Sequence, residues 1–332
     1  MESMTRYTYC DNLPSITHAT RVLARSSFLI IDCEGRNIGG TGGVLSLMCI
    51  GTERAEHIFV FDVLALKAHN ARLRPLVNIL ANPAVKKIMW DCRNDFLEIV
   101  AEYQVMLQGV LDLQLAEIQS RISIRGEREW KRLARLASGG RRLPLRLVKQ
   151  NPDLFLGVHS LQGMDACIRE ARLVTAGKDP QVVAMHKTNG SDMWLERPLL
   201  PQLLQYAAHD IEMIGALYEH FKQQSWITPT NTDDLVDQSM RYAYSMYYQG
   251  RVADDHIFGS CAVLPLDILR EPRGLIVPCQ DCNRMQSLHC FTINKSGRKI
   301  IGRTNICRVC QIKLLIKEVS YPVAWVSVNM NT

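Results

Sequence analysis

Two carboxylates stand at the end of a short apolar segment of this 332-residue sequence. Residues 28–31 read Phe-Leu-Ile-Ile, which is typical of a buried β-strand, and Asp32 and Glu34 follow directly. Side chains alternate along an extended chain, so Asp32 and Glu34 would lie on the same face. Carboxylates held this close repel each other unless a cation lies between them, and an oxygen-rich site suits Mg²⁺ or Mn²⁺. The pattern alone is more often a solvated turn, so the prediction depends on further acidic residues.

Further candidate ligands follow in two other segments. Asp95 comes after the strand-like residues 86–90, at the expected start of a helix. Tyr206 and Asp210 are four residues apart in an expected long helix, so a phenol and a carboxylate could approach the same bound group. Asp91 competes with Asp95, and we favour Asp95 because it would lie in the first helical turn. Three other polar residues are expected to be structural or surface residues: Asp62, Asp112 and His209.

The order and spacing of these residues resemble the DEDD superfamily of 3'-5' exonucleases, in its tyrosine-bearing DEDDy branch. The resemblance covers roughly residues 25–223 and is greatest for domains of the ribonuclease D, Werner and Egalitarian type. It implies a ribonuclease H-like fold and hydrolysis of RNA or single-stranded DNA from 3' ends, with release of nucleoside 5'-monophosphates. It assigns to Tyr206 the orientation or deprotonation of the attacking water. By position, it assigns two Mg²⁺ or Mn²⁺ ions to Asp32, Glu34, Asp95 and Asp210.

Two other functions stay open beside this one. Some relatives of the Egalitarian type have lost catalytic carboxylates and serve as RNA-binding adaptors, whereas this sequence retains every matching residue. A catalytically idle nucleic-acid-binding adaptor with the same fold is therefore the second hypothesis. A zinc-dependent interaction protein is the third.

The C-terminal part contains two closely spaced pairs of cysteines. Cys279 and Cys282 form one C-x-x-C pair, and 24 residues separate it from the second pair, Cys307 and Cys310. Four thiolates at this spacing suit one tetrahedral Zn²⁺ ion. Residues 291–301 alternate enough for a hairpin, which predicts a small zinc-ribbon-like or treble-clef module. Redox chemistry at the two pairs is the main alternative.

The remaining cysteines indicate a reducing environment. Six of the eleven cysteines are scattered before the C-terminal part, unlike the dense framework of a small secreted protein. Cys290 stands beside His289 and is expected to be a bystander, with substitution for another zinc ligand as the alternative. No apolar run reaches the roughly 18 uncharged residues of a membrane span, and the start lacks the features of a signal peptide. We expect an intracellular protein, nuclear or cytoplasmic, without a membrane partner.

The net charge of +6 is distributed unevenly along the chain. Residues 121–150 contain ten Lys or Arg and two Glu. Such a segment can neutralise the phosphates of RNA or single-stranded DNA, although basic runs are as often plain solvated surface. The candidate nucleic-acid contacts are Arg128, Lys131, Arg132 and Arg135.

An α/β core would position the carboxylates. Apolar segments predict strands at residues 28–31, 44–50, 57–61, 86–90 and 110–112. Helical spacing predicts helices within residues 73–80, 96–100, 115–122 and 197–221. This order predicts a ribonuclease H-like mixed sheet flanked by helices, with a small C-terminal module. We expect an N-terminal extension (1–24), an exonuclease domain (25–225) with a basic insertion (121–157), a helical linker (226–270) and a four-cysteine zinc module (271–320).

Overall fold

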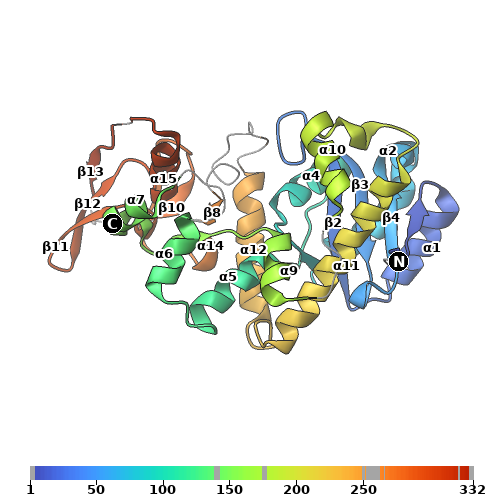
Figure 1. Ribbon diagram of the computed structural model, residues 1–332, viewed down its shortest axis with the longest axis horizontal. Coiled ribbons are helices and arrows are strands. Elements are labelled where there is room, and N and C mark those ends of the chain that lie inside the picture. The colour runs from blue at the N-terminus through green and yellow to red at the C-terminus, as the bar shows by residue number, and fades with distance from the viewer. Residues whose placement is uncertain are drawn as a thin grey trace. The chain divides into compact units, whose positions relative to one another are not determined.

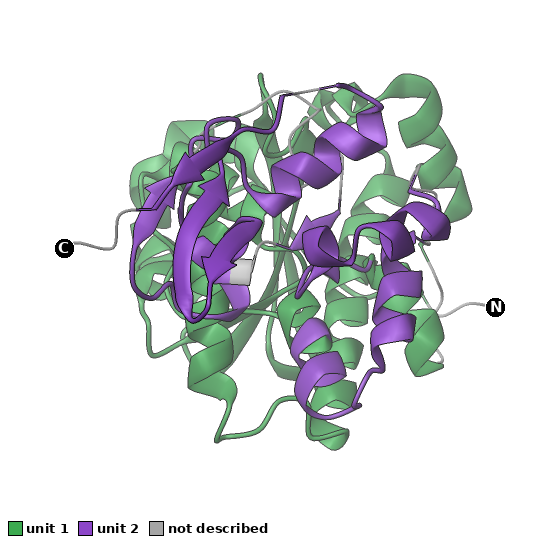
Figure 2. Ribbon diagram, turned by 90° about the vertical axis from the view of Figure 1, so that its left-hand side faces the viewer, with its two compact units in different colours: residues 1–117, 163–253 green, residues 118–162, 254–332 purple. Residues whose placement is uncertain are grey.

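The computed structural model describes residues 4–137, 143–173, 178–248, 251, 262–264, 266–320 and 322–328. The chain forms two compact units (Figure 2). Unit 1 comprises residues 1–117 and 163–253, and unit 2 comprises residues 118–162 and 254–332. Each unit is therefore assembled from two separate stretches of the chain.

A six-stranded mixed sheet forms the centre of unit 1. Its strands are β1 (Thr8–Cys10), β2 (Phe28–Arg36), β3 (Val44–Gly51), β4 (Ile58–Asp62), β5 (Lys86–Met89) and β6 (Val110–Asp112). They lie in the order β1-β4-β3-β2-β5-β6. β3 is antiparallel to β2 and β4, whereas β1 is parallel to β4, and β5 is parallel to β2 and β6. The α/β fold class and its five expected strands are confirmed, and β1 adds a sixth strand.

Helices connect and cover these strands. They are α1 (Leu13–Leu23), α2 (Val63–Leu66), α3 (Arg74–Ala81), α4 (Arg93–Tyr103), α5 (Leu113–Ser123), α9 (Met164–Ala171), α10 (Pro180–Asn189), α11 (Pro201–Gln223) and α12 (Thr232–Tyr247). Short 3-10 turns are η1 (Glu53–Ala55), η2 (Lys67–Leu73) and η3 (Asp192–Leu195). α5 begins in unit 1 and ends in unit 2. None of the helices in the described ranges is both long and apolar enough to cross a membrane.

The long helix α11 packs on β2, β3 and β4 (Figure 1). Two glycines allow this close approach. A Cβ added at Gly51 would lie 2.5 Å from Cγ2 of Ile211, and one added at Gly215 would lie 3.1 Å from Cδ1 of Ile30. The apolar face of the helix is buried in the core: Leu203, Ala207, Ile211, Ile214, Leu217 and Phe221. The position of α11 relative to β2 is therefore tightly constrained by packing.

Two segments that we expected outside the core contribute to unit 1. Residues 1–24 supply β1 and α1, and α12, from the expected linker 226–270, packs against α4 and β6. The backbone N–H of Asp112 donates to Ser239 Oγ at 2.8 Å. This contact gives the backbone N–H at the end of strand β6 a hydrogen-bond partner where water cannot reach it. α12 is therefore part of the core and not a solvated linker. The compact units thus differ from the predicted segments, and the domain boundaries themselves stay a prediction.

A buried ion pair connects the sheet to the start of α11. Arg197 donates from Nε to Asp62 Oδ2 at 2.7 Å and from Nη2 to Asp62 Oδ1 at 2.8 Å. The hydroxyl of Tyr9 also donates to Asp62, and Arg197 Nη2 reaches Ser46 Oγ at 2.8 Å. Burial by itself would raise the pKa of Asp62, but the hydrogen bonds from Arg197 and Tyr9 lower it below its ordinary value. Strands β1, β3 and β4 are thereby joined to the residues that precede α11.

Unit 2 combines short helices with small antiparallel sheets. Its helices are α6 (Glu129–Ala137), α7 (Leu145–Gln150), α8 (Pro152–Phe155), α14 (Leu266–Leu269) and α15 (Arg308–Lys317), with the 3-10 turn η4 (Leu288–Cys290). Its strands are β7 (His159–Ser160), β8 (Val263–Leu264), β9 (Ile276–Pro278), β10 (Met285–Ser287), β11 (Ile293–Ser296), β12 (Lys299–Thr304) and β13 (Trp325–Ser327). β7 pairs with β8, β9 with β10, and β12 with both β11 and β13. The β11–β12 pair confirms the expected hairpin, and Gly297 at its turn has a φ of +60°.

Replacing Arg197 by Met should destabilise unit 1 by about 3–5 kcal/mol, because the 1% exposed Asp62 side chain would keep its charge without its main partner. The folded-state pKa of Asp62 is lowered, so the pair stabilises above the unfolded pKa of about 4 and its contribution is lost as pH falls below that value. Urea unfolding of wild type and variant at pH 7 and at several lower pH values would show a difference that narrows with acidification.

Arg36→Met is the matched control for this experiment. Arg36 lies 3.6 Å from Asp192, and the two side chains are 36% and 76% exposed. Such a pair contributes about 0–1 kcal/mol. Equal losses of stability in the two variants would contradict a special role for the Arg197–Asp62 pair.

Candidate active site

Strand β2 extends beyond its neighbour β5 and presents two acidic side chains there. The parallel pairing of β2 with β5 ends at Ile30, opposite Ile88, while the pairing with β3 continues. Asp32 and Glu34 therefore follow the last residue that β5 covers, and they alternate on one face as expected. A parallel sheet commonly places its functional groups at this carboxyl end of the strands.

Helix α11 brings a third carboxylate to this face. One oxygen each from Asp32, Glu34 and Asp210 lie within 4.8 Å of one another. Asp210 is 3% exposed, and its Oδ1 has no hydrogen-bond partner among the described residues. Three residues separated by up to 178 positions are thus joined into one oxygen-rich cluster, which we call the carboxylate cluster.

The carboxylates of this cluster destabilise one another's charged forms. Burial, then repulsion from Asp210, raises the pKa of Asp32 to about 7, although Lys178 opposes this shift. Burial and the charges of Asp32 and Asp210 raise the pKa of Glu34 well above its ordinary value. Burial also raises the pKa of Asp210. A bound cation would relieve this repulsion, so the donor set fits divalent ions that prefer oxygen ligands.

Asp95 approaches the cluster from the first turn of α4. Burial, then the charge of Asp32, raises the pKa of Asp95 well above its ordinary value, while the backbone N–H of Cys33 lowers it by donating to the carboxylate. Asp91 is held differently, because Arg93 donates to both of its carboxylate oxygens at 2.6 and 2.7 Å. Asp95 is not among the three carboxylates that converge within 4.8 Å, and its role as the fourth ligand stays a prediction.

Tyr206 and Asp210 share one helix face, as their spacing predicts, and Lys178 connects them. Lys178 Nζ donates to the Tyr206 hydroxyl and to Asp210 Oδ2, both at 2.9 Å. Burial and the charge of Asp210 raise the pKa of Tyr206 above its ordinary value, more than Lys178 lowers it. The phenol is therefore protonated at neutral pH. Because its oxygen accepts from Lys178, its own proton is free to be donated to a water or a substrate oxygen.

Sequence reasoning missed Lys178. Burial alone would lower its pKa, but Asp210 and Tyr206 raise it, so the side chain carries a positive charge beside the cluster. Lys178 stands in a polar stretch with no strand or helix periodicity. No local signal could have placed it at the site, because its position depends on contacts with residues 28 and 32 positions away.

The polar residues expected to be structural have structural partners. His209 Nδ1 lies 3.0 Å from Glu212 Oε2, on α11. Asp112 accepts from the backbone N–H groups of Asp91 at 3.1 Å and Cys92 at 2.8 Å. Asp112 thereby fixes the turn between β5 and α4, which positions Asp95.

The candidate nucleic-acid contacts of the basic segment fall into two groups. Arg132 is 7% exposed and donates to Glu129 at 2.5 and 2.8 Å. Arg135 forms an ion pair with Glu127 at 2.7 Å. Both arginines thus have partners within unit 2, and their contact with nucleic acid stays a prediction. Two candidates are exposed: Arg128 and Lys131.

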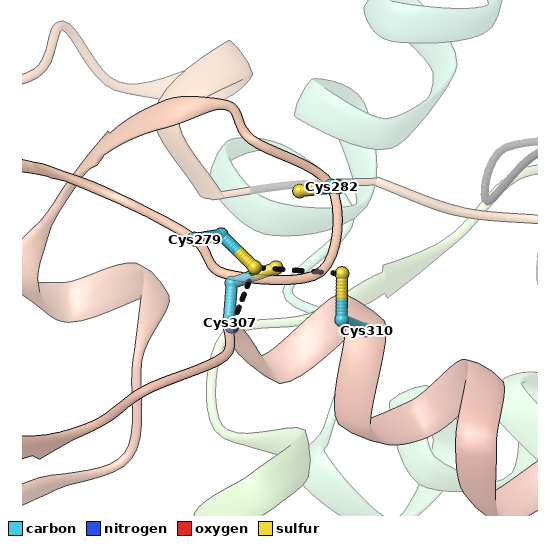
Figure 3. Close-up of side chains that lie close together, drawn as sticks. All are labelled: Cys279, Cys282, Cys307 and Cys310. Atoms are coloured by element: carbon cyan, nitrogen blue, oxygen red, sulfur yellow. Dashed lines mark hydrogen bonds between the residues drawn. The ribbon is translucent and has the colours of Figure 1, made fainter.

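The four cysteines of the two C-x-x-C pairs converge in unit 2 (Figure 3). Cys279 and Cys282 come from the turn between β9 and β10, and Cys307 and Cys310 come from the start of α15. Their sulfur atoms lie within 4.8 Å of one another. The second pair thus begins a helix, as in the treble-clef form of the expected module.

The spacing of the sulfur atoms suits a metal better than a disulfide. Cys279 Sγ lies 3.7 Å from Cys310 Sγ. Sulfur atoms around a tetrahedral Zn²⁺ with bonds of about 2.3 Å are separated by about 3.8 Å, whereas a disulfide requires about 2.05 Å. The backbone N–H of Cys307 donates to Cys279 Sγ at 3.2 Å, which favours a thiolate there. Cys290 lies outside this group and approaches Asp267 and His289 instead.

The sequence comparisons agree with the constellation of acidic residues. Residues 7–134 match the family described as 3'-5' exonuclease. Ribonuclease D of Haemophilus influenzae is 25% identical over 174 residues, which are 52% of this chain and 31% of that protein. The chain thus spans about a third of the length of this curated relative.

Solved structures show the same fold. Ribonuclease D of Trypanosoma brucei is 20% identical, with a TM-score of 0.55 over 75% of this chain and 76% of that chain. The same enzyme in complex with RNA U12 is 19% identical, with a TM-score of 0.52 over 73% of this chain and 72% of that chain. Residues 7–134 are thus similar to the 3'-5' exonuclease family, and the same chain contains the carboxylate cluster and a C-terminal four-cysteine cluster.

Proposed function

We propose that this chain is a metal-dependent 3'-5' exonuclease that hydrolyses the phosphodiester bonds of RNA and releases nucleoside 5'-monophosphates. The observation that carries this proposal is the convergence of carboxylates from β2 and α11 within 4.8 Å, with the Tyr206 phenol joined to Asp210 through Lys178. An idle adaptor of the same fold would have no need to keep mutually repelling carboxylates together. The named RNA-degrading relatives and the RNA complex of the Trypanosoma enzyme support RNA as the substrate class.

Two Mg²⁺ or Mn²⁺ ions fit the charge and the chemistry of the site. Within the described residues, one ammonium group, that of Lys178, donates to the carboxylate cluster. Bound divalent ions would supply Lewis-acid stabilisation of the negative charge on the attacking and departing oxygens. The residues that would hold them are Asp32, Glu34, Asp95 and Asp210.

The side chains of α11 would orient the attacking water. The Tyr206 phenol keeps its proton at neutral pH and can donate it in a hydrogen bond, so we assign it orientation rather than proton removal. Lys178 holds the phenol oxygen and Asp210 in fixed positions through its two hydrogen bonds.

The four-cysteine cluster would hold one structural Zn²⁺ ion. Contacts between α15 and α8 join this cluster to the segment 118–162. Arg308 Nη1 also donates to the carbonyl oxygen of Leu156 at 2.9 Å. The ion would therefore stabilise the whole of unit 2, because a small unit has little core of its own.

Replacing Asp32 by Asn should lower exonuclease activity at least about a thousandfold, because a ligand of the ions that stabilise the transition state is lost. Degradation of labelled single-stranded RNA with added Mg²⁺ or Mn²⁺, resolved at nucleotide length, measures this. Asp234→Asn, at an exposed carboxylate of α12, is the control and should keep wild-type activity. Wild-type turnover by the Asp32 variant would contradict the assignment of Asp32 as a metal ligand, and absence of degradation by the wild type would favour the adaptor.

The same variant tests the electrostatic account through pH. The folded pKa of Asp32 is raised to about 7, so the folded state binds more protons than the unfolded state between about pH 4 and 7. Without added divalent ions, stability should therefore fall as pH rises through this window, and less steeply in Asp32→Asn. Thermal unfolding measures both slopes. Identical slopes of stability against pH in wild type and variant would show that the pKa of Asp32 is not raised in the folded state.

Replacing Tyr206 by Phe should lower kcat about a hundredfold with KM changed only a few-fold, because the phenol acts on the water and not on substrate binding. Single-turnover degradation with varied enzyme concentration separates the two constants. Tyr9→Phe, which removes a phenol bonded to Asp62 outside the cluster, is the control. A raised KM with unchanged kcat would instead make Tyr206 a substrate-binding residue.

Replacing Cys282 by Ser should release one zinc ion per chain and loosen unit 2, while activity on short RNA persists. Native mass spectrometry counts the ion, and hydrogen exchange locates the loss of protection. Cys290→Ser, at a buried thiol outside the four, should retain the zinc. Stoichiometric zinc in the Cys282 variant would refute the four-cysteine site, and loss of zinc from the Cys290 variant would make Cys290 a ligand.

A further inference from the structure

Unit 2 contains a cavity of about 630 Å³, and every residue that lines it belongs to this unit. The volume lies in the range of small-molecule sites, about 300–1,000 Å³. Its walls come from two separate segments of the chain. The basic segment supplies Arg121 and Arg132, and the C-terminal segment supplies Arg270, Lys295 and Arg308.

The lining is predominantly cationic. Five Lys or Arg side chains line the cavity together with two carboxylates, those of Glu127 and Glu129. Both carboxylates are paired, Glu127 with Arg135 at 2.7 Å and Glu129 with Arg132 at 2.5 Å. Because cations outnumber carboxylates, the cavity attracts an anion.

The cations of the lining differ in how far a ligand can reach them. Arg270 and Lys295 are exposed, whereas Arg308 is 6% exposed. His159, also on the wall, is 8% exposed. Arg270 and Lys295 are therefore the groups most open to an anion in the cavity.

The His159 side chain on the cavity wall is uncharged at neutral pH. Burial, then the guanidinium groups of Arg132 and Arg121, lowers its pKa to about 4, so the imidazole is neutral at pH 7. Arg308 is fixed by its hydrogen bond to the Leu156 carbonyl at 2.9 Å, so its orientation is set before a ligand arrives.

Apolar side chains complete the wall. Ile122, Leu156, Leu269 and Ile293 line the cavity beside the cations. Ile122 is 44% exposed and Leu156 is 59% exposed. Burying these side chains against the flat face of a heterocyclic base would remove apolar surface from water. Inorganic phosphate would fill neither this volume nor this surface.

We propose that this cavity is a second nucleotide-binding site, in which a phosphate group accepts hydrogen bonds from Arg270 and Lys295 while a base packs against Ile122 and Leu156. The shared chemistry is a phosphate joined to a base, supplied by a free nucleoside monophosphate or by one unit of a single strand. The proposal does not rest on catalysis at the carboxylate cluster, because none of the cavity residues belongs to that cluster.

The test uses the full chain carrying Asp210→Asn, without added divalent ions, so that nothing is hydrolysed. Calorimetric titration compares 5'-AMP, a 12-nucleotide oligoadenylate and inorganic phosphate. 5'-AMP should bind at least about tenfold more tightly than phosphate, because only the nucleotide buries the apolar wall.

Two matched double variants locate the binding. Arg270→Gln with Lys295→Gln removes exposed charges of the lining and should weaken nucleotide binding about tenfold. Arg273→Gln with Lys299→Gln removes two exposed charges of the same unit that do not line the cavity, and affinity should change less than about twofold. Zinc content and circular dichroism check that each variant is folded.

The outcomes separate the sources of the ligand. A loss for both ligands in the lining variant assigns the site to a free nucleotide, and a loss for the oligoadenylate alone assigns it to a strand. Equal affinity for 5'-AMP and phosphate would overturn the proposal, as would equal losses in the two double variants. Failure of hydrolysis in the wild type would instead concern the carboxylate cluster and leave these titrations unchanged.

Discussion

Repulsion among closely spaced, partly buried carboxylates is the constraint on which this structure depends. Asp32, Glu34 and Asp210 are held within 4.8 Å, and Asp95 is close enough for Asp32 to raise its pKa. Left to themselves, such groups would move apart or take up protons. They stay together because each is fixed to a rigid element, and the ammonium of Lys178 compensates only part of the charge. The same repulsion would favour binding of a cation among them.

The rest of unit 1 prevents the cluster from relaxing. α11 cannot withdraw from β2, because Gly51 and Gly215 bring its backbone against the sheet and its apolar face lies in the core. The Arg197–Asp62 pair fixes the start of the same helix to β4. Packing and one buried ion pair therefore hold charges in place that their own interaction would separate.

Unit 2 has little apolar core and would need another source of stability. Its sheets are short, so four thiolates around one ion would replace a large core. Its cations have two kinds of surroundings. Arg132 and Arg135 pair with glutamates inside the unit, while Arg270 and Lys295 are exposed at a cavity. Two arginines of the basic segment thus have partners inside the unit, whereas two cations of the C-terminal segment are exposed at the cavity.

The sequence by itself determined the features that follow from local periodicity. Alternation along a strand put Asp32 and Glu34 on one face, helical spacing put Tyr206 and Asp210 on another, and the hairpin and the two cysteine pairs were readable in the same way. Only the tertiary structure decided which charges are buried. Lys178, α12 and the cavity around His159 and Arg308 depend on contacts between distant residues, and a charged or polar residue has the same sequence pattern whether it meets water or a buried partner.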